Sequence, residues 1–117
     1  MYFWSNSCHI VVEHSASLDS ELILPLVFSG ALKSELFETD GSDIKVRAIT
    51  YYSYLTGPEK ADFVHVVLKI LSGRTLEQKQ LLSKSVLVQL QKLELQTCSL
   101  TVEVVDIERA SYAKLVS

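Results

Sequence analysis

The sequence predicts an α+β fold in which two β-α-β units form a four-stranded sheet with both helices on one face. Two observations predict it: strand-like and helix-like patterns alternate in the order strand, helix, strand, twice over, and the two halves echo each other. The 117 residues are enough for one domain with its own core and too few for two. We expect residues 1–7 to be an extension and residues 8–117 to form the single domain.

Local patterns place the elements of each unit. The first unit is expected to be a strand over 8–14, a helix over 22–37 and a strand over 44–54; the second is expected to be a strand over 63–71, a helix over 75–95 and a strand over 100–108. Pro25 is expected in the first turn of its helix, where a missing N–H is tolerated. Thr75 and Gln78 have the spacing of a capping box. The run over 63–71 is almost wholly apolar, which indicates a strand buried on both faces.

Short segments recur in the same order in the two halves. His9–Val12 resembles His65–Leu68, Leu18–Glu21 resembles Leu76–Lys79, and Ile44–Arg47 falls where Leu100–Glu103 falls in the second unit. This common order indicates an internal duplication. The sheet face opposite the helices would then be bare. We expect that face to be apolar, and a bare apolar face of that size indicates an oligomer.

Composition excludes several classes of function. The net charge of −3 argues against a general nucleic-acid or anionic-membrane binder. Charge-free runs fall short of the roughly 20 residues of a membrane helix, and MYFWSNS lacks the regions of a signal peptide, so we expect a cytoplasmic protein. Cys8 and Cys98 form no CxxC pair; two reduced thiols are favoured over one disulfide. His9 and His14 lie five residues apart on one strand and face opposite sides, so no metal site is expected from them.

Three basic residues are the candidate binding groups. Lys45 and Arg47 lie two apart on a strand and so project to one face. Arg74 lies just before a helix amino terminus, where backbone N–H groups favour anions. Together they could bind a dicarboxylate, because an arginine can grip a carboxylate with two hydrogen bonds. The alternative interpretation is that all three are ordinary solvated charges. His65, inside an apolar strand, is interpreted as a satisfied core or interface histidine.

Several segments of the sequence resemble a known protein family. Asp62–Arg74 (DFVHVVLKILSGR), followed by Thr75-Leu76-Glu77, is similar to the matching strand, turn and helix start of the 5-carboxymethyl-2-hydroxymuconate isomerases, in the tautomerase superfamily. HIVVEHS, Leu24–Phe28 and Ile44–Arg47 match in the same order. The resemblance spans Cys8 to about Glu108.

The resemblance implies a trimer of β-α-β/β-α-β subunits without metal or cofactor. It implies an isomerase that moves a proton between carbons of an unsaturated dicarboxylate in bacterial homoprotocatechuate degradation. The family's base is the secondary amine of an amino-terminal proline, and basic residues hold the substrate carboxylates. Arg74 falls on the family's arginine in the GR turn, and Lys45 falls where the family tends to have an arginine. Cys8 falls on the catalytic proline, with seven residues before it.

Three functional hypotheses follow from the presence of a cysteine where the family has its catalytic proline. The first is an isomerase relative with an altered site, showing weak or no activity by the family's route. The second is a non-catalytic trimer that binds a small carboxylate. The third is a cysteine-based activity at Cys8, which requires a lowered thiol pKa. In the first two, Lys45 and Arg74 are expected to converge on one pocket, with a neighbouring subunit able to complete it.

Overall fold

Residues 6–117 are described by a computed structural model, and residues 1–5 of the expected extension lie outside the described residues. The elements are β1 (Cys8–Ser15), α1 (Ser20–Lys33), β2 (Ile44–Tyr51), β3 (Asp62–Leu71), α2 (Leu76–Leu90), the 3-10 turn η1 (Gln91–Leu93), β4 (Cys98–Ile107) and the 3-10 turn η2 (Arg109–Ser111). The predicted α+β fold of two β-α-β units is therefore confirmed.

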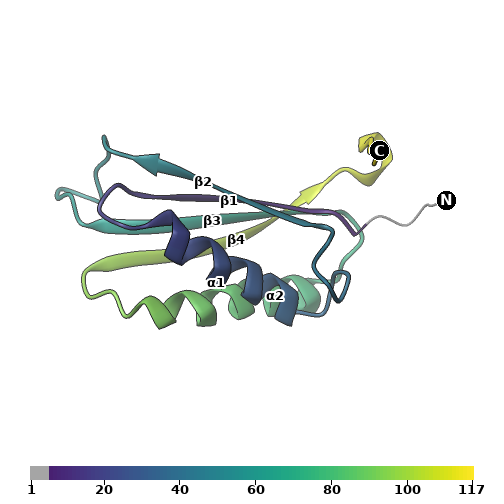
Figure 1. Cartoon of the computed structure of the whole chain (residues 1–117), viewed down its shortest axis with the longest axis horizontal. Helices are drawn as coiled ribbons and strands as arrows, with labels where there is room; N and C mark the ends of the chain where they lie inside the picture. The colour runs from purple at the N-terminus through teal and green to yellow at the C-terminus, as the bar shows by residue number, and fades with distance from the viewer. Residues whose placement is uncertain (1–5) are drawn as a thin grey trace.

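The four strands form one sheet in the order β2-β1-β3-β4. β1 pairs with β2 in parallel and β3 pairs with β4 in parallel, as each β-α-β unit requires, while β1 and β3 join the two units in antiparallel fashion. Both helices cover the same face of this sheet, and the start of β1 and the C-terminal segment lie at the same end of the molecule (Figure 1). That shared end brings the first described residues close to the C-terminal segment.

Helix α1 departs from its predicted bounds at both ends. It begins at Ser20 because the Asp19 side chain accepts a backbone N–H of the first turn. Pro25 therefore lies in the second turn and not the first, so the prediction for it was wrong. The helix ends at Lys33, not at residue 37, because the Ser34 hydroxyl donates to a carbonyl of the last turn and Glu35 adopts a left-handed φ of 61°.

Helix α2 begins as predicted and packs tightly on α1. Thr75 and Gln78 form a complete capping box. Gly30 lies where the helices meet: a Cβ atom there would be 2.6 Å from the Cα atom of Val86. The Ser85 hydroxyl also donates to the Gly30 carbonyl over 2.7 Å. The close approach of the two helices therefore requires glycine at position 30.

The core lies between the sheet and the helices. Alternate residues of the two central strands are buried there, namely Cys8, Ile10, Val12, His14, Val64, Val66, Leu68 and Ile70. β3 was predicted to be buried on both faces, and this is wrong for the subunit described: of its other alternate residues, Phe63, His65 and Val67 are only partly buried and Lys69 is exposed. His14 is satisfied within the core, with Nδ1 2.8 Å from the Ser15 carbonyl and Nε2 2.6 Å from the Ser20 hydroxyl.

The uncovered face of the sheet is mixed, and the prediction of an apolar face was wrong. The strand register places adjacent side chains in rows across it, namely Lys45–His9–Lys69–Val105, Arg47–Val11–Val67–Glu103 and Ile49–Glu13–His65–Thr101. Valines occupy the centre and charges surround them. His65 is satisfied there as expected: its ring nitrogens lie 2.6 Å from the Thr101 hydroxyl and 2.7 Å from the Glu103 carboxylate.

Candidate anion site

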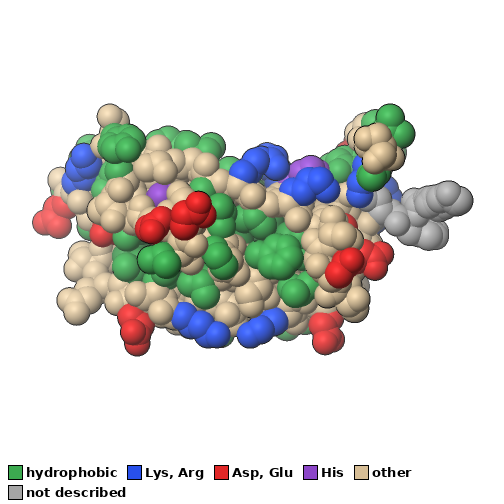
Figure 2. Space-filling model, in the orientation of Figure 1, with side chains coloured by type: hydrophobic (Ala, Val, Ile, Leu, Met, Phe, Trp, Pro, Cys, Tyr) green, Lys and Arg blue, Asp and Glu red, His purple; other side chains and the backbone are tan. Residues whose placement is uncertain are grey.

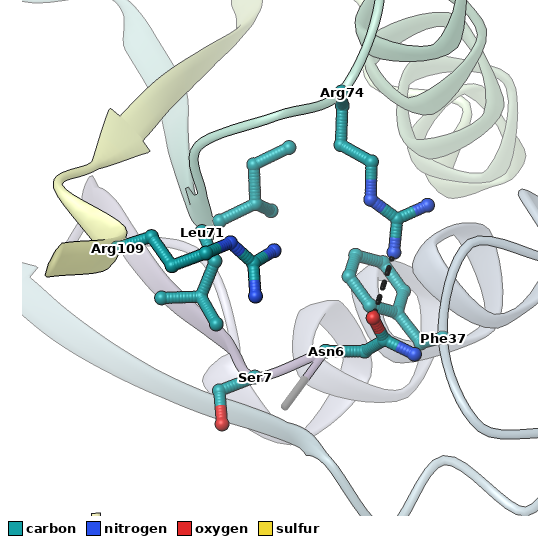
Figure 3. A pocket seen from close by; sticks show the side chains of 7 residues that line it. Asn6, Ser7, Phe37, Leu71, Arg74 and Arg109 are labelled. Atoms are coloured by element: carbon teal, nitrogen blue, oxygen red, sulfur yellow. Dashed lines mark hydrogen bonds between the residues drawn. The ribbon is translucent and has the colours of Figure 1, made fainter. Parts of the chain in front are cut away.

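A small hollow lies at the end of the sheet where the start of β1 meets the C-terminal segment. We call it the Arg74 pocket; it is lined by Asn6, Ser7, Phe37, Ile70, Leu71, Arg74 and Arg109. The chain leaves β3 at Leu71 and turns at Gly73, whose φ of 122° suits glycine, before α2 starts. That turn aims Arg74 back across the sheet end, and the guanidinium groups of Arg74 and Arg109 project into the same hollow (Figure 3).

Arg74 is held by several contacts inside the pocket. Its guanidinium donates to the Asn6 side-chain oxygen over 3.2 Å and to the Leu36 carbonyl, and it lies 5.9 Å from the centre of the Phe37 ring. Burial, and then the nearby charge of Arg109, lower the pKa of Arg74. An arginine keeps its proton at neutral pH despite such a shift. The pocket therefore holds a fixed, partly desolvated cation.

Cys8 lies beside the pocket but turns away from it. It is the first residue of β1, and its backbone N–H donates to the Asp43 carbonyl over 3.0 Å. Its side chain is 0% exposed, on the helix-covered face. Burial, followed by the charge of Asp43, raises the pKa of the Cys8 thiol to about 12, so the thiol stays protonated at neutral pH. The thiol does not line the Arg74 pocket.

Lys45 and Arg47 share a face, as predicted, but it is the uncovered sheet face. In the strand register Lys45 lies beside His9 and Arg47 beside Val11, and both cations are exposed. Neither lines the Arg74 pocket of the same subunit. One subunit therefore does not bring Lys45 and Arg74 together in a single hollow.

The C-terminal segment adds cations that sequence reasoning missed. The backbone N–H of Arg109 donates to the Ser72 hydroxyl over 3.2 Å, and its Nε donates to the Ser72 carbonyl over 3.0 Å. Further along, the Tyr112 hydroxyl lies 2.8 Å from Nε2 of His9, and Lys114 donates to the Ser7 hydroxyl over 2.9 Å. These contacts hold the segment against the amino-terminal end of β1.

The result is a region of positive potential. Burial lowers the pKa of His9, and so do, in decreasing order, the charges of Arg47, Lys45, Lys114 and Lys69. A histidine near cations resists protonation, so the four charge contributions, which act besides burial, indicate a positive local field. Figure 2 shows lysine and arginine side chains gathered around a histidine near the C-terminal segment. Such a region attracts small anions although the whole chain carries −3.

A larger, open hollow near the opposite end of the sheet has a different character. It encloses about 480 Å³ and is lined by Tyr54, Leu55, Thr56, Gly57, Phe63, Ser99 and Thr101. Its described lining residues are aromatic, aliphatic or hydroxylic, and none is charged.

Among residues 6–117 no group of three or more His, Cys, Asp or Glu could hold a metal ion, and no helix there is long and apolar enough to cross a membrane. Both cysteines are free.

Comparison with known proteins defines the class of protein first. The fold is shared with a 5-carboxymethyl-2-hydroxymuconate isomerase from Deinococcus radiodurans R1 (20% identity, TM-score 0.75, covering 97% of this chain and 92% of that one). A 5-carboxymethyl-2-hydroxymuconate delta-isomerase is similar at 16% identity and TM-score 0.77, over 96% and 90% of the two chains. A fused 4-OT described as a symmetric trimer is similar at 15% identity and TM-score 0.75, over 91% and 90%. The chain therefore has the tautomerase fold.

The sequence then places the chain within that class. The family model for 5-carboxymethyl-2-hydroxymuconate isomerase matches residues 8–115. The chain belongs to this family. No curated protein matches it significantly. The resemblance seen in the sequence is thus confirmed.

Proposed function

We propose that the protein binds a small unsaturated dicarboxylate at the Arg74 pocket and lacks the base that its family uses for proton transfer. The observation that carries the proposal is the state of the Cys8 nitrogen. That nitrogen is an amide N–H hydrogen-bonded to the Asp43 carbonyl, and an amide nitrogen is not basic. Arg74, by contrast, is proposed to keep the family's role of binding a substrate carboxylate.

The Cys8 thiol does not supply a replacement base. A general base must hold its free form at the working pH and must reach the proton within about 2.6–3.2 Å. With a pKa of about 12 and no exposed surface, this thiol meets neither condition. General base catalysis contributes about 10²–10⁴-fold to a rate, so we expect isomerase turnover lowered by about that factor.

Binding has support from charge and geometry. The Arg74 guanidinium is the strongest anchor for a carboxylate, because its planar fork can donate two parallel bonds. Lys45 and Arg47 extend the positive region over the adjoining face and are proposed to hold the far end of the ligand across a subunit boundary. The partner molecule is thus a dicarboxylate of the class handled in bacterial breakdown of aromatic acids.

The proposed assembly is a homotrimer in the cytoplasm. Two observations support the trimer: a similar protein with the same fold is described as a symmetric trimer, and the uncovered sheet face mixes valines with charged residues. The two free thiols suit a reducing compartment. Sedimentation equilibrium tests the assembly, and a stable monomer at micromolar concentration would contradict it.

Calorimetric titration with cis,cis-muconate, an unsaturated dicarboxylate, tests the binding site. Arg74→Ala should weaken binding at least about tenfold, because a hydrogen bond to a charged group is worth roughly 1.5–3 kcal/mol. Lys92→Ala, in η1, removes an exposed cation that lines none of the hollows described above and should leave affinity unchanged. Equal affinity of Arg74→Ala and the unaltered protein contradicts the proposal.

A further inference from the structure

The two residues before β1 occupy the Arg74 pocket. Asn6 and Ser7 both line it, and no water-sized sphere fits into the space that remains. Ser7 is only 1% exposed. Figure 3 shows the Asn6 side chain reaching toward Arg74 inside the hollow. The place where a carboxylate would meet Arg74 is therefore filled by the chain itself.

The contacts of these two residues are those that an anion would make. The Asn6 side-chain oxygen accepts from the Arg74 guanidinium over 3.2 Å. The Ser7 hydroxyl oxygen accepts from the ammonium group of Lys114 over 2.9 Å. Both acceptors are neutral oxygens, so they satisfy the donors without neutralising the charge. A carboxylate in the same place would make stronger, charge-assisted bonds.

Cations gather around the pocket. Arg74 and Arg109 project into one hollow, and Lys114 binds its border through Ser7. The acidic group that acts on Arg74 is Asp43, which is buried and accepts the backbone N–H of Glu38 through both carboxylate oxygens at 3.2 Å. Three cations therefore border one small hollow, an arrangement that favours an anionic ligand over a neutral one.

We propose that Asn6 and Ser7 are an internal ligand, an Asn6–Ser7 plug, of an anion site built by Arg74, Arg109 and Lys114, and that a dicarboxylate binds by displacing them. This inference rests on the proposed function and adds two things to it. The C-terminal segment supplies Arg109 and Lys114 to the site, and the Asn6–Ser7 plug competes with the ligand.

Displacement requires no break in the sheet. The ladder begins at Cys8, whose own N–H bond to the Asp43 carbonyl anchors the start of β1. The plug's contacts with Arg74 and Lys114 run through side chains only. The pocket can therefore open by movement of the two residues ahead of Cys8 while β1 stays paired.

Titration with cis,cis-muconate tests the plug in two opposite directions. The double variant Asn6→Gly with Ser7→Gly removes both competing oxygens and should bind about tenfold tighter than the unaltered protein, equal to roughly 1.4 kcal/mol. Asn6→Asp keeps the shape but places a carboxylate beside Arg74, and should bind at least about tenfold more weakly. Ser53→Gly, an exposed bend residue, is the matched control and should change nothing.

The C-terminal half of the site is tested in the opened double variant. There Arg109→Ala or Lys114→Ala should each weaken binding about tenfold, and circular dichroism reports whether each variant is folded. If the opened variant and Asn6→Asp bind as the unaltered protein does, while Arg74→Ala still loses affinity, the plug is wrong and the proposed function stands. If no variant binds, opened or not, both are wrong.

Discussion

Cys8 should react with alkylating reagents far more slowly in the folded protein than in the unfolded chain. Only the thiolate reacts. At about pH 8 a thiol with the ordinary pKa of 9.0 is roughly 10% ionised, whereas one with a pKa of about 12 is roughly 0.01% ionised. Ionisation alone therefore slows the reaction about a thousandfold, and the absence of exposed side-chain surface slows it further.

The assay is iodoacetamide labelling followed by peptide mass spectrometry. The Cys98→Ser variant leaves Cys8 as the reporter, and labelling in guanidinium chloride gives the unfolded rate. Cys98, whose pKa is also raised by burial but whose side chain is partly exposed, is the internal comparison in the Cys8→Ser variant. A folded-state rate for Cys8 within about tenfold of the unfolded rate would refute the burial argument and revive a cysteine-based activity.

Two further predictions concern stability. Gly30→Ala should lower the free energy of unfolding by about 1–3 kcal/mol, because the new Cβ would meet the backbone of Val86 at 2.6 Å. Ser29→Ala on the same helix is the control and should be close to neutral. Equal urea midpoints for the two variants would contradict the packing account. Alkaline pH should also destabilise the protein. The folded pKa of Cys8 lies above the ordinary value, so its contribution is complete below about pH 9 and falls by up to about 1.4 kcal/mol per unit as pH rises toward 12. In urea unfolding at several pH values, Cys8→Ala should reduce this dependence of the unfolding free energy on pH. An unchanged dependence would contradict the role given to the buried thiol.

Much of the fold could be predicted because its signals are local. The capping box at Thr75 and the alternation along β2 act over a few residues, and the repeated segments show the duplication directly. Errors arose where a local pattern was ambiguous. The apolar pattern after Lys33 continues past the helix, and only the Ser34 hydroxyl bond and the left-handed Glu35 end it.

The site was predictable only in part. Arg74 could be found because it belongs to a specific motif at a turn. The C-terminal segment has no periodicity, and its place is fixed by single long-range contacts such as Tyr112 with His9. Sequence alone also gives no sign that Asn6 reaches Arg74, since their contact spans 68 positions. The separation of Lys45 from the pocket follows from the sheet face on which β2 places it.

The most direct measurement of the central claim is isomerase turnover with the family's hydroxymuconate substrate. Two proteins are compared: the chain as printed, and a chain that starts at position 8 with Cys8→Pro after removal of the initiator methionine. The account predicts turnover by the printed chain about 10²–10⁴-fold below that of the proline version, with substrate affinity still dependent on Arg74. Equal turnover by the two chains, unaffected by Cys8→Ala, would show that the base lies elsewhere and contradict the account.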